Sequence, residues 1–346
     1  MDKRSFIKKT ALATAGMITL PNIIIAGKTR PQTGILGHGS HKYRVVYDWG
    51  VQDVSKIPVK DCHEMIQDSR GRLVLLTNET KNNVIIYDRS GKVLKTWGTE
   101  YPGAHGLTLA KENEEDFLFI TDQERHQVFK TDLDGEVLMT LDFPQGTDHY
   151  QSPDQYKPTE VTVTPNGDFY VADGYGEQHI MHYNHKGELL NIFGGRGEGP
   201  EYFDNAHGIC YDDRDKANPI LLITARQQNA VKRYTLTGEY MDTIALPGAS
   251  ICRPVIDEDN VYFAVIVSHG RWSMPSGFVC ILDKDNKVIS NPGGSIPIYD
   301  QGELQKMHQT IMLFTHPHDV CVDQDKNIYV PQWNSGQTYP IKLERI

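Results

Sequence analysis

The chain has 346 residues, of which 39% are hydrophobic and 23% are charged, and this composition excludes an intrinsically disordered protein. It carries 35 Lys and Arg against 45 Asp and Glu, a formal net charge of −10, which argues against nucleic acid as a partner because phosphate binding requires excess positive charge. The 30 glycines, 18 prolines and 17 tyrosines favour many short strands joined by turns over long helices.

The N-terminal thirty residues differ from the rest because they are basic. They contain one acidic residue, Asp2, and six basic residues: Lys3, Arg4, Lys8, Lys9, Lys28 and Arg30. An apolar stretch over residues 10–26 has signal-peptide length and is short for a membrane span. Residues 3–8, Lys-Arg-Ser-Phe-Ile-Lys, resemble a twin-arginine signal with Lys3 in place of the first arginine. We predict an export signal and the start of a linker over 1–30, a linker over 31–40, and a periplasmic or secreted location. A Sec signal or an uncleaved anchor is the alternative.

Six short β-rich runs recur along the remaining chain, at residues 73–77, 117–122, 169–173, 221–225, 261–265 and 328–331. In the clearer copies one strand precedes the run, and a further strand with a glycine turn follows it. Four strands in a repeat of about 40 to 50 residues are typical of a propeller blade. The last copy reaches Ile346 with too few strands, whereas residues 42–49 form a strand without a repeat. We therefore predict an all-β fold, a six-bladed β-propeller over 41–346 whose last blade the N-terminal strand closes, which would remove exposed edges.

The first strand of each blade lines the central channel, so the residues that open these strands converge near the axis. Four of the six openings contain a histidine: Cys62-His63-Glu64-Met65, Ala104-His105-Gly106-Leu107, Pro158-Thr159-Glu160-Val161, Ala206-His207-Gly208-Ile209, Ile251-Cys252-Arg253 and Pro317-His318-Asp319-Val320. His105, His207 and His318 fall on alternate blades, about a third of a turn apart. Three imidazoles can thus meet at one axial point and hold a divalent ion, zinc above all, with an open position for chemistry. The alternative is a ring of histidines around channel water.

His63, on the first blade, is expected to lie beside this trio. It would be a further metal ligand, a general acid or base, or only a residue that lines the channel. The five cysteines are odd in number and form no Cys-x-x-Cys pair, so buried free thiols are expected.

Several motifs in register resemble the peptidylglycine amidating lyases, which are NHL-repeat six-bladed propellers: Ala-His105-Gly-Leu, residues 121–130, Pro158-Thr-Glu-Val with Val171-Ala-Asp-Gly-Tyr175, Ala-His207-Gly-Ile and Pro317-His-Asp-Val320. The resemblance covers most of residues 43–346. It implies zinc on His105, His207 and His318. It also implies a structural calcium on main-chain oxygens of Met65 and Leu107 and on Asp319.

The same resemblance implies that Tyr175 acts in catalysis and that Arg226 is an active-site arginine. Tyr175 would serve as a base, provided that a nearby cation favours the phenolate, or would only hydrogen-bond the substrate. Arg226 would bind an anionic group, or would form a surface salt bridge. The other arginine of the family aligns with Asn78, and Gly176 stands where the family has a cysteine, which predicts weaker carboxylate recognition and poor turnover of α-hydroxyglycine derivatives.

These observations predict an exported, monomeric, metal-dependent lyase that cleaves a hydroxylated small molecule, anionic or carbohydrate, with no membrane contact once the signal is removed. Two alternatives stay open. A divalent metal at the same site also suits a sugar lyase, isomerase or hydratase. A non-enzymatic propeller that serves as a binding platform would not need converging histidines.

Overall fold

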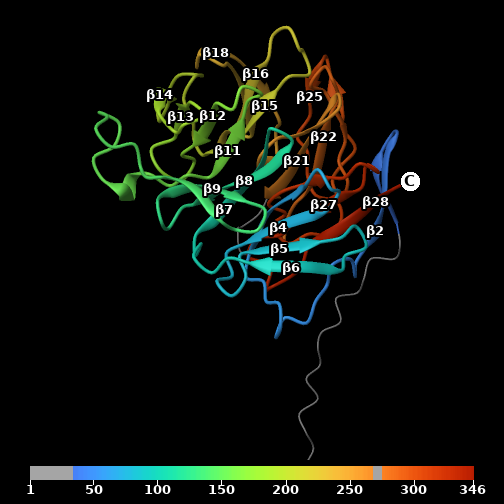
Figure 1. The fold of residues 1–346 in the computed structure, drawn as a ribbon. Helices are drawn as coiled ribbons and strands as arrows, with labels where there is room; N and C mark the ends of the chain where they lie inside the picture. The colour runs from blue at the N-terminus through green and yellow to red at the C-terminus, as the bar shows by residue number, and fades with distance from the viewer. Residues whose placement is uncertain (1–33, 268–274) are drawn as a thin grey trace, which may run out of the picture. The chain divides into compact units, whose positions relative to one another are not determined.

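The computed structural model describes residues 34–267 and 275–346. Within these residues the secondary structure is β-strand, apart from two short 3-10 segments, η1 (Pro153–Gln155) and η2 (Arg226–Gln228). Six antiparallel sheets are the blades of a β-propeller, and a seventh is a two-stranded hairpin (Figure 1), so the predicted fold class is confirmed.

The first four blades each contain four strands in sequence order. Their bounds are β3 (Cys62–Gln67), β4 (Leu73–Thr77), β5 (Val84–Tyr87) and β6 (Val93–Trp97); β7 (Ala104–Glu112), β8 (Glu115–Asp122), β9 (Gln127–Asp132) and β10 (Val137–Leu141); β11 (Glu160–Val163), β12 (Phe169–Ala172), β13 (His179–Tyr183) and β14 (Leu189–Gly194); and β15 (Ala206–Asp212), β16 (Ile220–Ala225), β17 (Ala230–Thr235) and β18 (Tyr240–Ala245). The innermost strand β11 lies beside β7 and β15 of the neighbouring blades.

The fifth blade has an interrupted inner strand. It consists of β19 (Ser250–Ile251) and β20 (Val255–Asp257), both paired to β21 (Asn260–Val267), followed by β22 (Phe278–Leu282) and β23 (Val288–Ser290). Pro254 lies in the gap between β19 and β20, where a residue without a backbone N–H cannot donate to the ladder. A small hairpin of β24 (Tyr299–Asp300) and β25 (Glu303–Leu304) follows.

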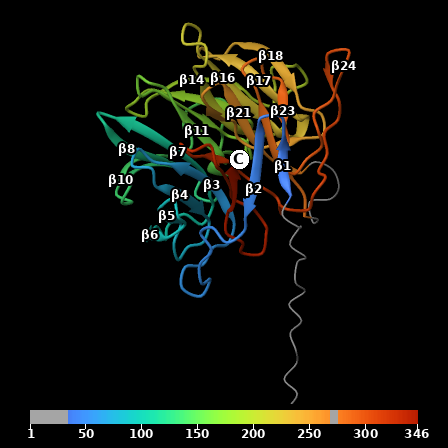
Figure 2. The same cartoon turned by 90° about the vertical axis from the view of Figure 1, so that its right-hand side faces the viewer.

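The sixth blade joins the two ends of the described chain. Its strands run β26 (Cys321–Val322), β27 (Ile328–Val330), β28 (Ile341–Arg345), β2 (His41–Val46) and, outermost, β1 (Ile35–His38). The range predicted as linker, residues 31–40, therefore contains a strand, because β1 pairs with β2 through a tight turn at Gly39. Figure 2 shows β1 and β2 beside the C-terminus.

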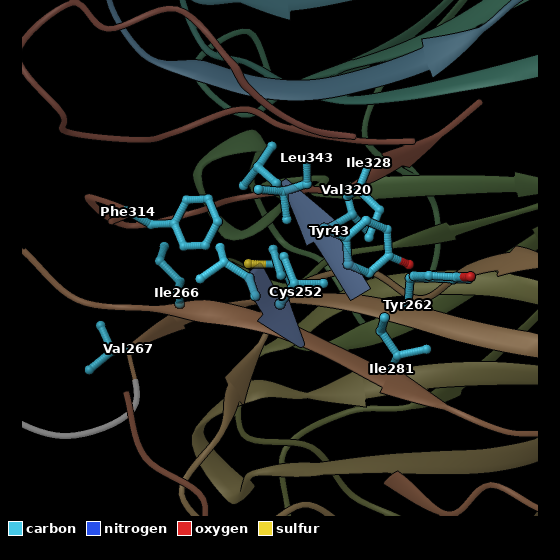
Figure 3. Packing of buried hydrophobic residues seen from close by; sticks show 14 residues of the cluster. Tyr43, Cys252, Tyr262, Ile266, Val267, Ile281, Phe314, Val320, Ile328 and Leu343 are labelled. Carbon is cyan, nitrogen blue, oxygen red and sulfur yellow. The ribbon is translucent and has the colours of Figure 1, made fainter. Parts of the chain in front are cut away.

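The contact between β2 and β28 is a ladder with a buried core beneath it. Tyr43 pairs with Arg345 and Val45 with Leu343. The Tyr43 side chain is fully buried and packs in one hydrophobic cluster with Leu343, Ile328 of the sixth blade and Tyr262 of the fifth (Figure 3). The N-terminal strand thus satisfies the edge of β28 and covers apolar surface that would otherwise face water.

In the first blade the middle strands are the most buried, since each residue of β4 and of β5 is buried. The outer strand β6 contains only half-buried and exposed residues. The turn between β5 and β6 requires glycine, because Gly91 has φ 93° and an added Cβ would lie 2.5 Å from the Gly50 nitrogen. Apolar runs in the second strands, and glycine turns between the third and fourth strands of the first four blades, explain why the sequence repeat is visible.

The predicted signal over residues 1–30 lies outside the described residues. In residues 34–267 and 275–346 there is no helix with the length and hydropathy that a membrane span requires.

Candidate active site on the propeller axis

Three of the four axial histidines sit at irregularities of their inner strands. The pairing register shifts between Cys62 and Glu64, between Ala104 and Leu107, and between Ala206 and Ile209, and each shift contains a histidine: His63, His105 and His207. A β-bulge re-aims a side chain out of the regular alternation. The repeated histidine therefore points its ring along the axis rather than into the space between blades.

The glycines that follow two of these histidines are required by close backbone approach. A Cβ added to Gly106 would lie 2.5 Å from the Thr159 carbonyl oxygen, and one added to Gly208 would lie 2.3 Å from the Arg253 Cα. The His-Gly pairs of blades two and four are thus explained by packing as well as by the site.

Four imidazoles gather on the axis, and all are buried. The ring centroids of the predicted trio lie 4.8 Å apart for His105 and His207, 4.8 Å for His105 and His318, and 5.0 Å for His207 and His318. His63 lies 4.9 Å from His105 and 4.7 Å from His318. One ring nitrogen from each of His63, His105 and His318 lies within 4.8 Å of the others. This group of three contains His63 and leaves out His207, so it differs by one member from the predicted trio.

The histidine cluster fits a divalent metal ion on three counts. Burial lowers the pKa of His63 to about 3 and lowers the pKa of His105, His207 and His318 well below the usual value, so each ring is neutral and able to coordinate. The Nδ1 atoms of His105 and His318 contact the carbonyl oxygens of Thr159 and His63, at 2.8 and 3.1 Å. Such contacts orient metal-binding imidazoles.

The third argument for a metal ion, after the neutral state and the orientation of the rings, is that three buried ring nitrogens have no hydrogen-bond partner among the described residues. They are both nitrogens of His63 and Nδ1 of His207. A buried polar atom left without a partner costs free energy. A bound ion would satisfy nitrogens that the protein alone does not.

Tyr175 follows β12 and places its hydroxyl among the imidazoles. The Tyr175 Oη lies 3.2 Å from Nε2 of His105 and 3.2 Å from Nε2 of His207. The turn that carries it is fixed by Asp173, whose carboxylate accepts hydrogen bonds from the backbone of Lys157 and from the Tyr150 hydroxyl, at 2.6 and 2.7 Å. Tyr175 is thus held beside the histidine cluster.

Arg226, at the start of η2, faces the same hydroxyl. Its side chain is buried, at 3% exposure, and its Nη1 donates to Tyr175 Oη at 3.3 Å. The other guanidinium nitrogens contact uncharged groups, the Ile251 carbonyl and the Cys252 thiol, both at 3.4 Å. Burial raises the pKa of Tyr175, and the Arg226 guanidinium opposes that shift. Arg226 therefore does not form the surface salt bridge considered as an alternative.

A pocket of about 360 Å³ opens over this group. Its lining includes Tyr175, Arg226, His318 and, unforeseen from the sequence, Arg196. Arg196 is exposed at the surface, and its Nη2 donates to the Gly176 carbonyl at 2.9 Å. Neither arginine has a carboxylate partner within the part of the chain that the structure describes. The only hint in the sequence was the glycine-rich stretch around Arg196, which permits a loop to approach the site.

Asn78 does not reach this pocket. It is tied to Asp61, whose backbone N–H it caps at 3.0 Å and whose carboxylate accepts from its amide at 3.1 Å. The five cysteines are all unpaired, in agreement with the expected free thiols.

The residues predicted to bind calcium also converge on the axis, next to the histidines. The Met65 and Leu107 carbonyls and the Asp319 carboxylate all contact the guanidinium of Arg253. A protein cation thus already occupies this set of oxygens.

No protein-family profile matches the chain. It is 40% identical over 271 residues to peptidyl-α-hydroxyglycine α-amidating lyase 1 of Drosophila melanogaster, an alignment that covers 71% of this chain and 46% of the relative. It is 26% identical over 154 residues to the human NHL repeat-containing protein 3, covering 42% of this chain and 44% of the relative. The chain spans about half the length of the curated relatives it matches.

Among solved structures, a streptogramin B lyase superimposes with a TM-score of 0.55 at 15% identity, covering 83% of this chain and 94% of that one. At this identity the likeness concerns the fold alone. The strand arrangement defines the class: the chain is a six-bladed β-propeller, and in sequence it is similar to an NHL repeat-containing protein. Within that class it is similar to the peptidyl-α-hydroxyglycine α-amidating lyases, as the motifs predicted.

Proposed function

We propose that the protein is a metal-dependent lyase of the amidating type, which cleaves the C–N bond at a carbon that carries a hydroxyl group. One observation carries this proposal: the Tyr175 hydroxyl lies within hydrogen-bond distance of two axial imidazoles and of the buried Arg226. The 40% identity to a lyase of this type supports it.

The chemistry assigned to the chain's own residues is a proton transfer. Tyr175, as phenolate, accepts the proton of the substrate hydroxyl at Oη; the O–H electron pair becomes the carbonyl bond, and the C–N bond breaks. The protonated Tyr175 then gives that proton to the departing nitrogen, which leaves as the amide, and Tyr175 returns to the phenolate. Arg226, 3.3 Å from Oη, stabilises the phenolate, since an adjacent cation favours the charged form of an acid.

The metal would be held by His105, His207 and His318, with His63 close enough to serve as a further ligand. When bound, a divalent ion of the zinc type would acidify the substrate hydroxyl as a Lewis acid. The site is buried, which excludes water and strengthens the electrostatic effect of Arg226.

The test is glyoxylate release from an α-hydroxyhippurate by the zinc-loaded full-length protein, beside a panel of oxidised sugars. Release that disappears in His105→Ala and persists in the exposed His185→Ala would support the proposal. Turnover of a sugar without glyoxylate release would overturn it in favour of a carbohydrate lyase, isomerase or hydratase. A protein that binds no metal and turns over neither substrate would be a binding platform.

Export to the periplasm or the medium stays a prediction from residues 1–30. Cell fractionation of the full-length protein and of a variant with Arg4→Lys would test it, because loss of export in that variant indicates a twin-arginine route.

A further inference from the structure

A single side chain from blade five sits at the centre of the propeller. Arg253 lies in the gap between β19 and β20, is 8% exposed, and donates to the Leu107 carbonyl at 2.8 Å and to the Met65 carbonyl at 3.1 Å. It binds both carboxylate oxygens of Asp319, at 2.8 and 2.9 Å. Its Nη1 also lies 3.1 Å from a carboxylate oxygen of Glu64. One guanidinium therefore cross-links blades one, two, five and six.

This arrangement does not fit a calcium ion on the same oxygens. Calcium requires six to eight oxygen ligands at about 2.3–2.6 Å, whereas the carbonyls of Met65 and Leu107 and the carboxylate of Asp319 are engaged by N–H donors. The guanidinium fills the position with five donors in a fixed planar fork and with its own positive charge. A second cation placed there would meet that charge.

The sequence around Arg253 explains how the side chain reaches the axis. Pro254 interrupts the inner strand of the fifth blade, so Arg253 is freed from the ladder that would fix its direction. Gly208 of the fourth blade makes room for it, since a Cβ at that position would lie 2.6 Å from the Arg253 Cβ. The gap and the glycine act together to admit one long side chain.

We propose that Arg253 takes the place of a structural calcium in this protein, so that the axis is held together by a built-in cation and its stability does not depend on calcium. Asp319 follows His318, and Glu64 follows His63. The guanidinium therefore fixes the backbone from which two axial imidazoles project, and it acts as a positioning group for the histidine cluster.

The experiment compares thermal unfolding of wild type, Arg253→Ala and Arg214→Ala after chelation, with and without added calcium. Arg214 is a suitable control because it forms a largely buried ion pair with Asp212 at 2.7 Å, away from the axial oxygens. We expect a wild-type melting temperature that calcium does not change. Arg253→Ala should melt roughly 6–10 °C lower, because it leaves buried carboxylates unpaired, and calcium should restore part of that loss. Arg214→Ala should be destabilised without a calcium response.

Stoichiometric calcium in the purified wild type, with a fall in melting temperature on its removal, would overturn the inference even if Arg253→Ala does not fold. An Arg253→Ala protein that folds but responds to calcium no more than Arg214→Ala would overturn it as well.

A separate observation, the unpaired Arg196 at the pocket, carries a second inference, which rests on the proposed function. We infer that Arg196 binds the carboxylate of the substrate and compensates for Asn78. Its guanidinium is anchored to the Gly176 carbonyl by Nη2 alone, so the remaining N–H groups are available for a carboxylate fork. The three guanidinium nitrogens of Arg226 already donate to Tyr175, Ile251 and Cys252. Arg226 is therefore less suited to bind the substrate carboxylate.

The test measures binding by calorimetry, with hippurate and its neutral analogue hippuramide as probes, so that it does not depend on turnover. Arg196→Ala should weaken hippurate binding roughly tenfold or more and leave hippuramide binding unchanged, while Arg70→Ala, an exposed arginine in the turn between β3 and β4, should change neither. Equal affinity of wild type for the two probes, or an Arg196→Ala protein with unchanged preference, would overturn the inference. Failure of glyoxylate release would instead count against the proposed function.

Discussion

Replacing Tyr175 by phenylalanine separates the two roles that its hydroxyl can have. Phenylalanine keeps the ring and removes only Oη, the atom 3.2 Å from the Nε2 atoms of His105 and His207 and 3.3 Å from Arg226. A general base contributes about 10²–10⁴-fold to kcat, or about 2.7–5.4 kcal/mol of barrier. A neutral hydrogen bond to substrate contributes only about 0.5–1.5 kcal/mol, at most roughly tenfold.

The two roles therefore predict ranges that do not overlap. As a base, Tyr175→Phe should lower kcat at least a hundredfold with a small change in KM, measured as glyoxylate release at saturating substrate with the metal content verified. The matched control is Tyr170→Phe, which also removes a buried hydroxyl, one bonded to the Leu236 carbonyl at 2.8 Å, and should retain activity. A loss below tenfold in Tyr175→Phe, or one confined to KM, would refute the assignment of Tyr175 as the base.

Three further outcomes follow from the same structure. Elemental analysis should find the divalent metal lost in His207→Ala and kept in His185→Ala, and equal retention would remove His207 from the metal site. Tyr43→Ala, at the fully buried closing contact, should lower the free energy of unfolding by about 3–5 kcal/mol in denaturant titration, whereas the 63%-exposed Ile35→Ala should cost no more than about 0.5 kcal/mol; similar values would argue against closure through β2. Burial lowers the pKa of His179 to about 4, so between pH 6.5 and about 4 the unfolded chain binds the extra proton and stability falls as the pH falls; His179→Gln should make that decline shallower, and an unchanged slope would contradict this.

The sequence by itself determined the blades and their order. The second strand of each blade is a short, mostly apolar run, and a glycine turn joins the third and fourth strands of the first four blades. The repeat is therefore visible in local patterns that need no distant contact. The repeated histidine was visible for the same reason, because His63, His105 and His207 occupy equivalent positions. The incomplete last copy, together with an unmatched strand near the start, predicted the strand that pairs with β28.

Only the tertiary structure decided what these positions face. The bulges that turn His105 and His207 onto the axis depend on the glycines and carbonyls of the next blade, which no local pattern encodes. The entry of His63 into the cluster depends on ring positions from separate blades. Arg196 and Arg253 belong to no repeated motif, and they reach the pocket and the axis because a loop and a broken strand bring them there. A cation acts through its distance to oxygens far away in the chain, and the folded packing alone sets that distance.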